Sequence, residues 1–264
     1  MGYKLGILGF GNMGSAIAEG ALLKGVIKAG DVYVYNRSNP AMLKAEELGF
    51  NCVSSEDELW KASDIILLAI KPQFMAEALS SIKKTNKPRA VISVAAGLTT
   101  ERLRAMMPGP VRILRTMPNT PVMVGEGMTA LCEGSDLMPD ELDLAEDIFK
   151  SIGLVQWIRE DEINAVGALS GGAPAYAAMF IEALGDGGVK VGLKRDISYK
   201  LAAQALLGAA KMIIDMDIHP GELKDMVTSP KGTTIEAVET LEKGSFRYTV
   251  MDAVVKATEK AGKM

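Results

Sequence analysis

Short apolar runs alternate with helix-length segments from Tyr3 to about Ile158. The runs with strand-like composition are KLGIL (4–8), VYVYN (32–36), DIILLAI (64–70), AVISVA (90–95), VRILRTM (111–117), MTALCE (128–133) and LVQWI (154–158). Those up to residue 117 are apolar at nearly every position, as expected of strands covered on both faces. Strands that alternate with helices in this way predict a parallel sheet in a doubly wound α/β fold.

The pattern changes after Ile158, where strand signals stop and helical segments rich in Ala, Leu, Met and Gly follow. GG, HPG and SPKG breaks separate these segments. We therefore expect an α/β domain at residues 1–160 and an all-helical domain at residues 161–264. Small residues allow helices to pack closely, but they leave few large apolar side chains in each helix to form a core within one subunit. We therefore expect these helices to form an interface between subunits.

Composition narrows the classes of partner. The 264-residue chain has a formal net charge of -4, which gives no electrostatic reason to expect nucleic acid or an anionic membrane. Cys52 and Cys132 are the only cysteines, and no cluster of Cys and His has the spacing of a metal site. No basic-then-apolar leader precedes the first strand. We expect a cytoplasmic protein that binds no metal.

The first predicted strand runs directly into GFGNMG, and a helical segment follows it. Gly9, Gly11 and Gly14 have the spacing of a dinucleotide fingerprint, in which glycines allow a tight turn, an approach to the diphosphate and helix packing. This context predicts a Rossmann domain whose cofactor-binding residues include the intervening Phe10, Asn12 and Met13. A glycine turn without a ligand is the alternative.

The second predicted strand ends in Asn36-Arg37-Ser38, where NAD-specific proteins usually carry an acid for the ribose hydroxyls. Arg37 can pair with a 2′-phosphate, Ser38 can add a hydrogen bond, and no carboxylate at this strand end repels the extra charge. NADPH is therefore the expected cofactor, with NADH possible. If Arg37 were only a solvated loop residue, the preference would be weak.

Further strand ends should line the same crevice, because ligands of open α/β sheets bind outside the carboxyl ends of the strands. The segment AIKPQ is expected beside the adenosine ribose, and SVAAGLT has small residues that let a nicotinamide ring approach. RTMPNTP (115–121) places a polar amide near that ring, although it could also be only a rigid linker. The expected contacts are Ala69, Lys71, Pro72, Ala95, Ala96, Gly97 and Asn119.

GFGNMG, KPQ, SVAAGLT and RTMPNTP occur in the order and spacing of the pyrroline-5-carboxylate reductase family, which the chain resembles over nearly its full length. GELKDMVTSPKGTTIEAVETLE (221–242) is similar to that family's signature region, and SGGAPAY (170–176) to its SGSGPAY helix start. The chain departs from the family at Lys231, where a glycine is usual, and at Gly172-Ala173, where Ser-Gly is more common. Lys231 could change the turn, add a cation near a carboxylate, or point to solvent.

The residues also suggest where a substrate carboxylate binds. The segment 229–234 enters a helix, so its backbone N–H groups and hydroxyls are suited to an anion, although they could also serve only to cap that helix. The expected substrate residues are Ser229, Gly232, Thr233, Thr234 and Asp217. The resemblance implies that Thr234 orients the imine or relays a proton. Asp217 stands where similar proteins often have an acid, and it could favour the iminium form or be a solvated charge.

The resemblance implies an enzyme that reduces 1-pyrroline-5-carboxylate to L-proline, the last step of proline biosynthesis, as a homodimer built on C-terminal helices or a higher oligomer. Hydride transfer to a C=N bond needs no metal. His219, the only histidine, is better explained by a helix-to-helix turn than by acid catalysis.

Other functions share parts of this pattern. A β-hydroxyacid dehydrogenase would use a lysine at the start of its second domain, where this chain has SGGAPAYAAMF and no lysine before Lys190. A reductase of another cyclic imine and a non-catalytic NADPH-binding module remain as alternatives. Turnover with imines of different ring size distinguishes the two reductases, and ligand binding without turnover is the signature of the non-catalytic module.

Overall fold

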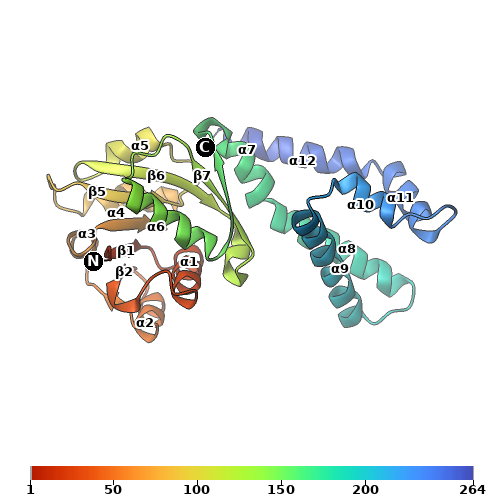
Figure 1. Ribbon diagram of the computed structural model, residues 1–264, viewed down its shortest axis with the longest axis horizontal. Coiled ribbons are helices and arrows are strands. Elements are labelled where there is room, and N and C mark those ends of the chain that lie inside the picture. The colour runs from red at the N-terminus through yellow and green to blue at the C-terminus, as the bar shows by residue number, and fades with distance from the viewer. Residues whose placement is uncertain (1, 264) are drawn as a thin grey trace. The chain divides into compact units, whose positions relative to one another are not determined.

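The computed structural model describes residues 2–263, which divide into two compact units. The first comprises residues 2–171 and 258–263, and the second is Gly172–Ala257. All strands of the described residues lie in the first unit (Figure 1), namely β1 (Leu5–Leu8), β2 (Val32–Tyr35), β3 (Asn51–Cys52), β4 (Ile65–Leu68), β5 (Arg89–Ser93), β6 (Val111–Pro118), β7 (Gly127–Cys132) and β8 (Gly153–Ile158).

The strands form one sheet in the order β3-β2-β1-β4-β5-β6-β7-β8. From β1 the chain proceeds outward through β2 and β3, and it then returns to place β4 on the other side of β1. The strand order therefore reverses between β1 and β4, and in such sheets the reversal opens a crevice at the carboxyl ends of the strands. The predicted glycine turn follows β1 at this position.

Helices cover both faces of the sheet. One core contains Ile7 with side chains from α1 (Asn12–Leu23), α2 (Asn39–Glu47) and α6 (Pro139–Lys150). The other contains Leu8 with side chains from α3 (Glu56–Ala62), α4 (Pro72–Ser80) and α5 (Thr100–Met106). Neighbouring residues of β1 point into opposite cores, which explains why this strand is apolar at consecutive positions. The doubly wound fold is confirmed.

Two details of the sheet differ from expectation. The short strand β3 was not predicted, because two residues, one of them an exposed Asn, carry no strand pattern. The expectation of an entirely parallel sheet is wrong at β7, which pairs antiparallel with β6 and parallel with β8. Only a short link containing the 3₁₀ turn η2 (Thr120–Val124) joins β6 to β7. A parallel pair needs a much longer crossover.

Short helical turns complete the first unit. They are η1 (Ala29–Asp31), η3 (Glu160–Glu162), α7 (Ile163–Val166) and the π-helical turn η4 (Gly167–Gly171). The described residues of the second unit are all helical, as predicted, in α8 (Ala173–Lys190), α9 (Arg195–Met216), α10 (Pro220–Met226), α11 (Thr233–Lys243) and most of α12 (Phe246–Ala261).

Close helix contact in the second unit depends on small residues. Helices α8 and α9 lie side by side (Figure 1), and a Cβ atom at Gly185 of α8 would stand only 2.3 Å from the Tyr199 ring of α9. The glycine thus makes room for an aromatic ring between the helices, as the small-residue composition predicts. Much of the remaining apolar surface is uncovered within the protomer, including Met179, Leu201, Leu207, Ile214 and Met251.

Candidate cofactor and substrate sites

The glycine turn after β1 has the geometry of an anion site. Gly9 has φ +100°, a conformation that side chains strongly disfavour, and a Cβ at Gly14 would lie 2.1 Å from the Gly9 carbonyl oxygen. A Cβ at Gly11 would meet no atom within 4 Å. Gly11 therefore leaves open space beside the start of α1, whose first N–H groups have no helical acceptor. This cradle fits the diphosphate of a dinucleotide.

Side chains behind the turn hold it in place. The Asn36 side-chain oxygen, at the end of β2, accepts a hydrogen bond from the Phe10 backbone N–H at 3.0 Å. The Phe10 ring is buried and packs edge-on against Phe50, with ring centroids 5.9 Å apart, while Met13 is partly buried against the same core. Among the expected cofactor residues, the Phe10 and Met13 side chains thus have packing roles.

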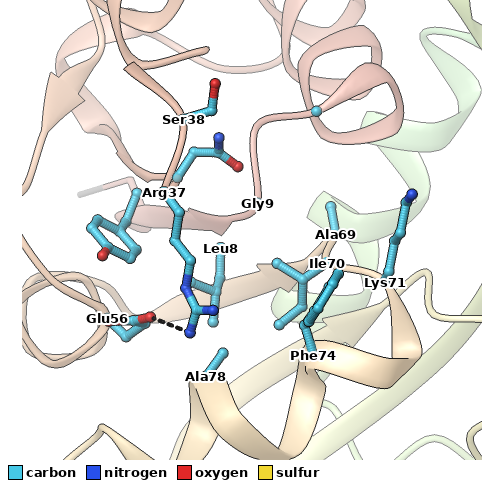
Figure 2. A pocket seen from close by; sticks show the side chains of 13 residues that line it. Leu8, Gly9, Arg37, Ser38, Glu56, Ala69, Ile70, Lys71, Phe74 and Ala78 are labelled. Carbon is cyan, nitrogen blue, oxygen red and sulfur yellow. Dashed lines mark ion pairs between the residues drawn. The ribbon is translucent and has the colours of Figure 1, made fainter. Parts of the chain in front are cut away.

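A pocket of about 480 Å³ adjoins the glycine turn (Figure 2). It brings together residues from the ends of β1, β2 and β4 and from α3 and α4, lined by Leu8, Gly9, Gly11, Tyr35, Asn36, Arg37, Ser38, Glu56, Ala69, Ile70, Lys71, Phe74 and Ala78. Seven of these lining residues were expected cofactor contacts, namely Gly9, Gly11, Asn36, Arg37, Ser38, Ala69 and Lys71. The ends of β1, β2 and β4 thus meet at one cavity, which we name the Arg37 pocket, whereas Pro72, Ala95, Ala96, Gly97 and Asn119 do not line it.

Arg37 is held by two carboxylates. Figure 2 shows its side chain extending toward Glu56, with Ile70, Lys71 and Phe74 on the opposite side of the pocket. The guanidinium lies 3.0 Å from a Glu77 oxygen and 3.6 Å from a Glu56 oxygen. The hydrogen bond to Glu77 and the charges of both acids raise the pKa of Arg37. No acid stands at the strand end itself, as expected, but acids from α3 and α4 reach the arginine.

The predicted segments after β4 and β5 follow their strands directly. Pro72 begins α4, after Lys71 as its N-cap residue. Past β5, Ala95 is buried, Ala96 is exposed and Gly97 adopts φ +76°. Because these three residues are small, the loop that follows β5 carries no bulky side chain at residues 95–97.

Asn119 connects three segments of the first unit. Its amide nitrogen donates to the backbone and side-chain oxygens of Ser170, each at 3.2 Å, and its oxygen accepts from the Met128 N–H at 2.9 Å. These bonds occupy both ends of the amide group. In the described structure Asn119 therefore fixes the link between β6 and β7 against η4.

A buried ion pair lies where β6 meets η3. The Arg115 side chain is 4% exposed and donates to Glu160 at 2.9 Å, while the Thr100 N–H and hydroxyl donate to the same carboxylate oxygen at 2.7 and 2.8 Å. Burial alone would raise the pKa of Glu160, but these hydrogen bonds and the arginine charge outweigh it and lower the pKa. The pair ties the end of the sheet to the segment that leads into the helical half of the chain.

The predicted substrate segment opens α11 in the second unit. Gly232 is the N-cap residue, so Thr233 and Thr234 occupy the first helical turn, and both are exposed. The Gly232 N–H donates to the Ser229 carbonyl at 2.9 Å, which closes the preceding turn. Unpaired N–H groups and two hydroxyls therefore face outward at one helix start, which suits a carboxylate.

Left-handed backbone occurs at two further residues of the predicted substrate site, Lys231 and Asp217. Lys231 has φ +56° and is exposed, so it adopts the conformation that a glycine would favour. Asp217 ends α9 with φ +51° and is also exposed.

His219 has a structural role. Its Nδ1 atom accepts a hydrogen bond from the Gly221 N–H at 3.0 Å and thereby caps α10. This confirms the interpretation of HPG as a turn between helices. Among the described residues, no group of three or more His, Cys, Asp or Glu side chains could hold a metal ion.

Sequence reasoning missed several pocket residues. Glu56 begins α3, and Phe74 and Ala78 lie within α4, so no strand-end rule pointed to them. Phe74 carried one usable signal, since an aromatic residue shortly after a strand end is a residue type that can pack against a flat ring.

The fold and the site define an NADP-binding oxidoreductase with a Rossmann domain and a helical domain. Two family models match the chain. The model for NADP oxidoreductase, coenzyme F420-dependent, matches residues 4–97, and the model for pyrroline-5-carboxylate reductase dimerisation matches residues 160–264.

Full-length relatives are more specific. The pyrroline-5-carboxylate reductase of Escherichia coli is 42% identical over 264 residues, covering 99% of this chain and 98% of that protein. A structure of pyrroline carboxylate reductase from Plasmodium falciparum with NADP bound is 38% identical, with a TM-score of 0.86 and coverage of 98% and 97%. The enzyme from Coxiella burnetii is 32% identical, with a TM-score of 0.91 and coverage of 99% and 98%. The chain belongs to the pyrroline-5-carboxylate reductase family.

Proposed function

We propose that this protein reduces 1-pyrroline-5-carboxylate to L-proline by direct hydride transfer from NADPH, with the cofactor held at the glycine turn and the Arg37 pocket. The observation that carries the assignment is the open cradle at Gly11, which adjoins an arginine-lined pocket at the carboxyl ends of β1, β2 and β4. When bound, NADPH supplies the hydride, and the protein contributes binding, orientation and electrostatics.

The cofactor contacts are assigned along the crevice. The backbone N–H groups of Asn12 and Met13 bind the diphosphate, and Gly11 lets it approach. Arg37 and Ser38 bind the 2′-phosphate. The other expected contacts serve the ribose and nicotinamide, at Ala69, Lys71, Pro72, Ala95, Ala96 and Gly97. Asn119 acts by positioning these loops, because its amide is already occupied by Ser170 and Met128.

The start of α11 binds the substrate. The N–H groups of Thr233 and Thr234 and the turn at Ser229 to Gly232 hold the carboxylate, since a helix N-terminus stabilises negative charge. The Thr234 hydroxyl orients the imine nitrogen or relays its proton. The Asp217 carboxylate favours the protonated iminium, which accepts hydride more readily than the neutral imine.

We propose that the protein forms a homodimer through its C-terminal helices, and that such dimers can assemble into larger rings. The exposed apolar side chains of α8, α9 and α12 need a partner surface. Helix α9 is long and apolar enough by composition to cross a membrane, and only 11% of its most apolar window is buried in the protomer. A single such helix is weak support for a membrane span, and the dimerisation family match covers it.

The proposed division of labour follows the predicted domains, with cofactor binding in residues 1–160 and dimerisation and substrate binding in residues 161–264. The cytoplasm is the proposed location, because Cys52 and Cys132 are free thiols.

The test follows NADPH absorbance after addition of 1-pyrroline-5-carboxylate, with NADH in parallel and proline measured as the product. The wild type should oxidise NADPH and form one proline for each NADPH. Thr234→Ala should lower kcat with little change in NADPH affinity, whereas Thr240→Ala, which removes a hydroxyl farther along α11 that donates to the Glu236 carbonyl, serves as the matched control.

Each rival makes a different prediction in this assay. A reductase of another cyclic imine would prefer a six-membered ring over the five-membered substrate. A non-catalytic module would bind NADPH and oxidise it with neither imine, and this result would exclude the proposed activity.

A further inference from the structure

The Arg37 pocket contains one acidic group, Glu56, which does not belong to the usual signals of cofactor choice. We propose that Glu56 is a specificity-determining residue, whose carboxylate opposes the 2′-phosphate of NADPH, favours the 2′-hydroxyl of NADH, and so keeps both cofactors usable. This inference rests on the proposed function, because it assumes that the Arg37 pocket holds the adenosine end of the cofactor.

Position distinguishes Glu56 from an incidental surface acid. It is the first residue of α3, its side chain is only 10% exposed, and it lies in the pocket wall 3.6 Å from the Arg37 guanidinium (Figure 2). Glu77, the other partner of Arg37, is 64% exposed. An exposed pair is weakened by water and salt, so Glu77 can leave Arg37 at little cost. Glu56 stays beside the arginine when a ligand arrives.

A ribose 2′-hydroxyl and a 2′-phosphate interact differently with the Glu56 carboxylate. An ionised carboxylate only accepts hydrogen bonds, so it binds a ribose hydroxyl but has nothing to donate to a phosphate. A 2′-phosphate that pairs with Arg37 must also lie near this negative charge, and like charges at short range repel. Arg37 therefore favours NADPH and Glu56 favours NADH. Their combined effect is a modest preference for NADPH in place of a strong one.

Nucleotide fragments test this without turnover. Isothermal titration of the full-length protein with adenosine 2′,5′-bisphosphate and with 5′-AMP gives two dissociation constants, whose ratio measures preference for the 2′-phosphate. The variants are Glu56→Gln, which removes the charge at nearly constant shape, and Glu77→Gln as the matched control. Glu56→Asp, which keeps the charge, and Glu56→Ala, which removes it without an amide, complete the set.

Glu56→Gln and Glu56→Ala should raise preference for the bisphosphate about tenfold, the size expected for removing one nearby charge repulsion. The ratio of kcat/KM for NADPH over NADH should rise in parallel. Glu56→Asp should stay near the wild type, and Glu77→Gln should change the preference by less than about twofold.

An unchanged ratio in both neutral Glu56 variants would overturn the inference, as would an equal effect of Glu77→Gln. If that happened while the wild type still reduced 1-pyrroline-5-carboxylate, only the role of Glu56 would be wrong. If the wild type bound neither nucleotide, the assignment of the Arg37 pocket under the proposed function would be wrong as well.

Discussion

The glycine turn leads to a prediction in which one substitution weakens cofactor binding and yet leaves the stability of the fold nearly unchanged. Gly11 has φ -82° and ψ -164°, an extended conformation open to any residue, and a Cβ there would meet no atom within 4 Å. Gly11→Ala should therefore change the free energy of unfolding by less than about 1 kcal/mol, because alanine restricts the unfolded chain but caps the start of α1 less well than glycine.

The same methyl group would occupy the space that we assign to the diphosphate. Losing one charge-assisted hydrogen bond there costs about 1.5–3 kcal/mol, which corresponds to a weakening of NADPH binding by about 10- to 100-fold. Gly14→Ala is the matched contrast, because its Cβ would lie 2.1 Å from the Gly9 carbonyl oxygen. A collision between backbone segments of this kind should destabilise the fold by about 3 kcal/mol.

Two assays at one fixed protein concentration separate these effects. Denaturant unfolding measures stability, and isothermal titration with NADPH measures affinity. The reasoning is refuted if Gly11→Ala is destabilised like Gly14→Ala, because the space at Gly11 would then not be open. It is equally refuted if Gly11→Ala binds NADPH as the wild type does, because the diphosphate would then not approach this residue.

Two further substitutions test the stability of the fold. Glu160→Ala leaves the buried Arg115 without its partner, and we expect a loss of about 2 kcal/mol, less than for a fully buried pair because Glu160 is 38% exposed. Since the folded-state pKa of Glu160 is lowered, its contribution is present at neutral pH and is lost as the pH falls through that pKa. The wild type and the variant should therefore converge in stability in acid, and a constant difference down to low pH would contradict this. Lys231→Gly should raise the free energy of unfolding by about 1 kcal/mol, because it relieves the left-handed backbone, while Lys231→Ala should not. Equal stability of the Gly and Ala variants would show that backbone strain at this position is negligible.

The sequence predicted where the Arg37 pocket lies because parallel strands place their carboxyl ends along one edge of a sheet. Gly9, Arg37 and Lys71 are far apart in the chain, yet their positions after consecutive inner strands were enough to bring them to one pocket. The helical second half was equally predictable, since its period and its breaks are local properties.

What the sequence did not predict depends on contacts that no local pattern carries. Glu56 reaches Arg37 from the start of α3, after a strand of 2 residues that has no recognisable pattern. The reversed direction of β7 follows from a link too short for a crossover, although its composition is that of an ordinary strand. Asn119 was expected near the cofactor, whereas its hydrogen bonds to Ser170 and Met128 depend on the folded backbone.

The most direct test of hydride transfer is an isotope experiment. NADPH carrying deuterium at C4 of the nicotinamide, prepared separately in each of the two stereochemical forms, is incubated with the enzyme and 1-pyrroline-5-carboxylate, and the proline is examined by mass spectrometry and NMR. The account predicts that one form delivers deuterium to the proline δ-carbon, which was the imine carbon, and that the other does not. Proline without deuterium from either form, or no proline despite NADPH binding, would contradict it.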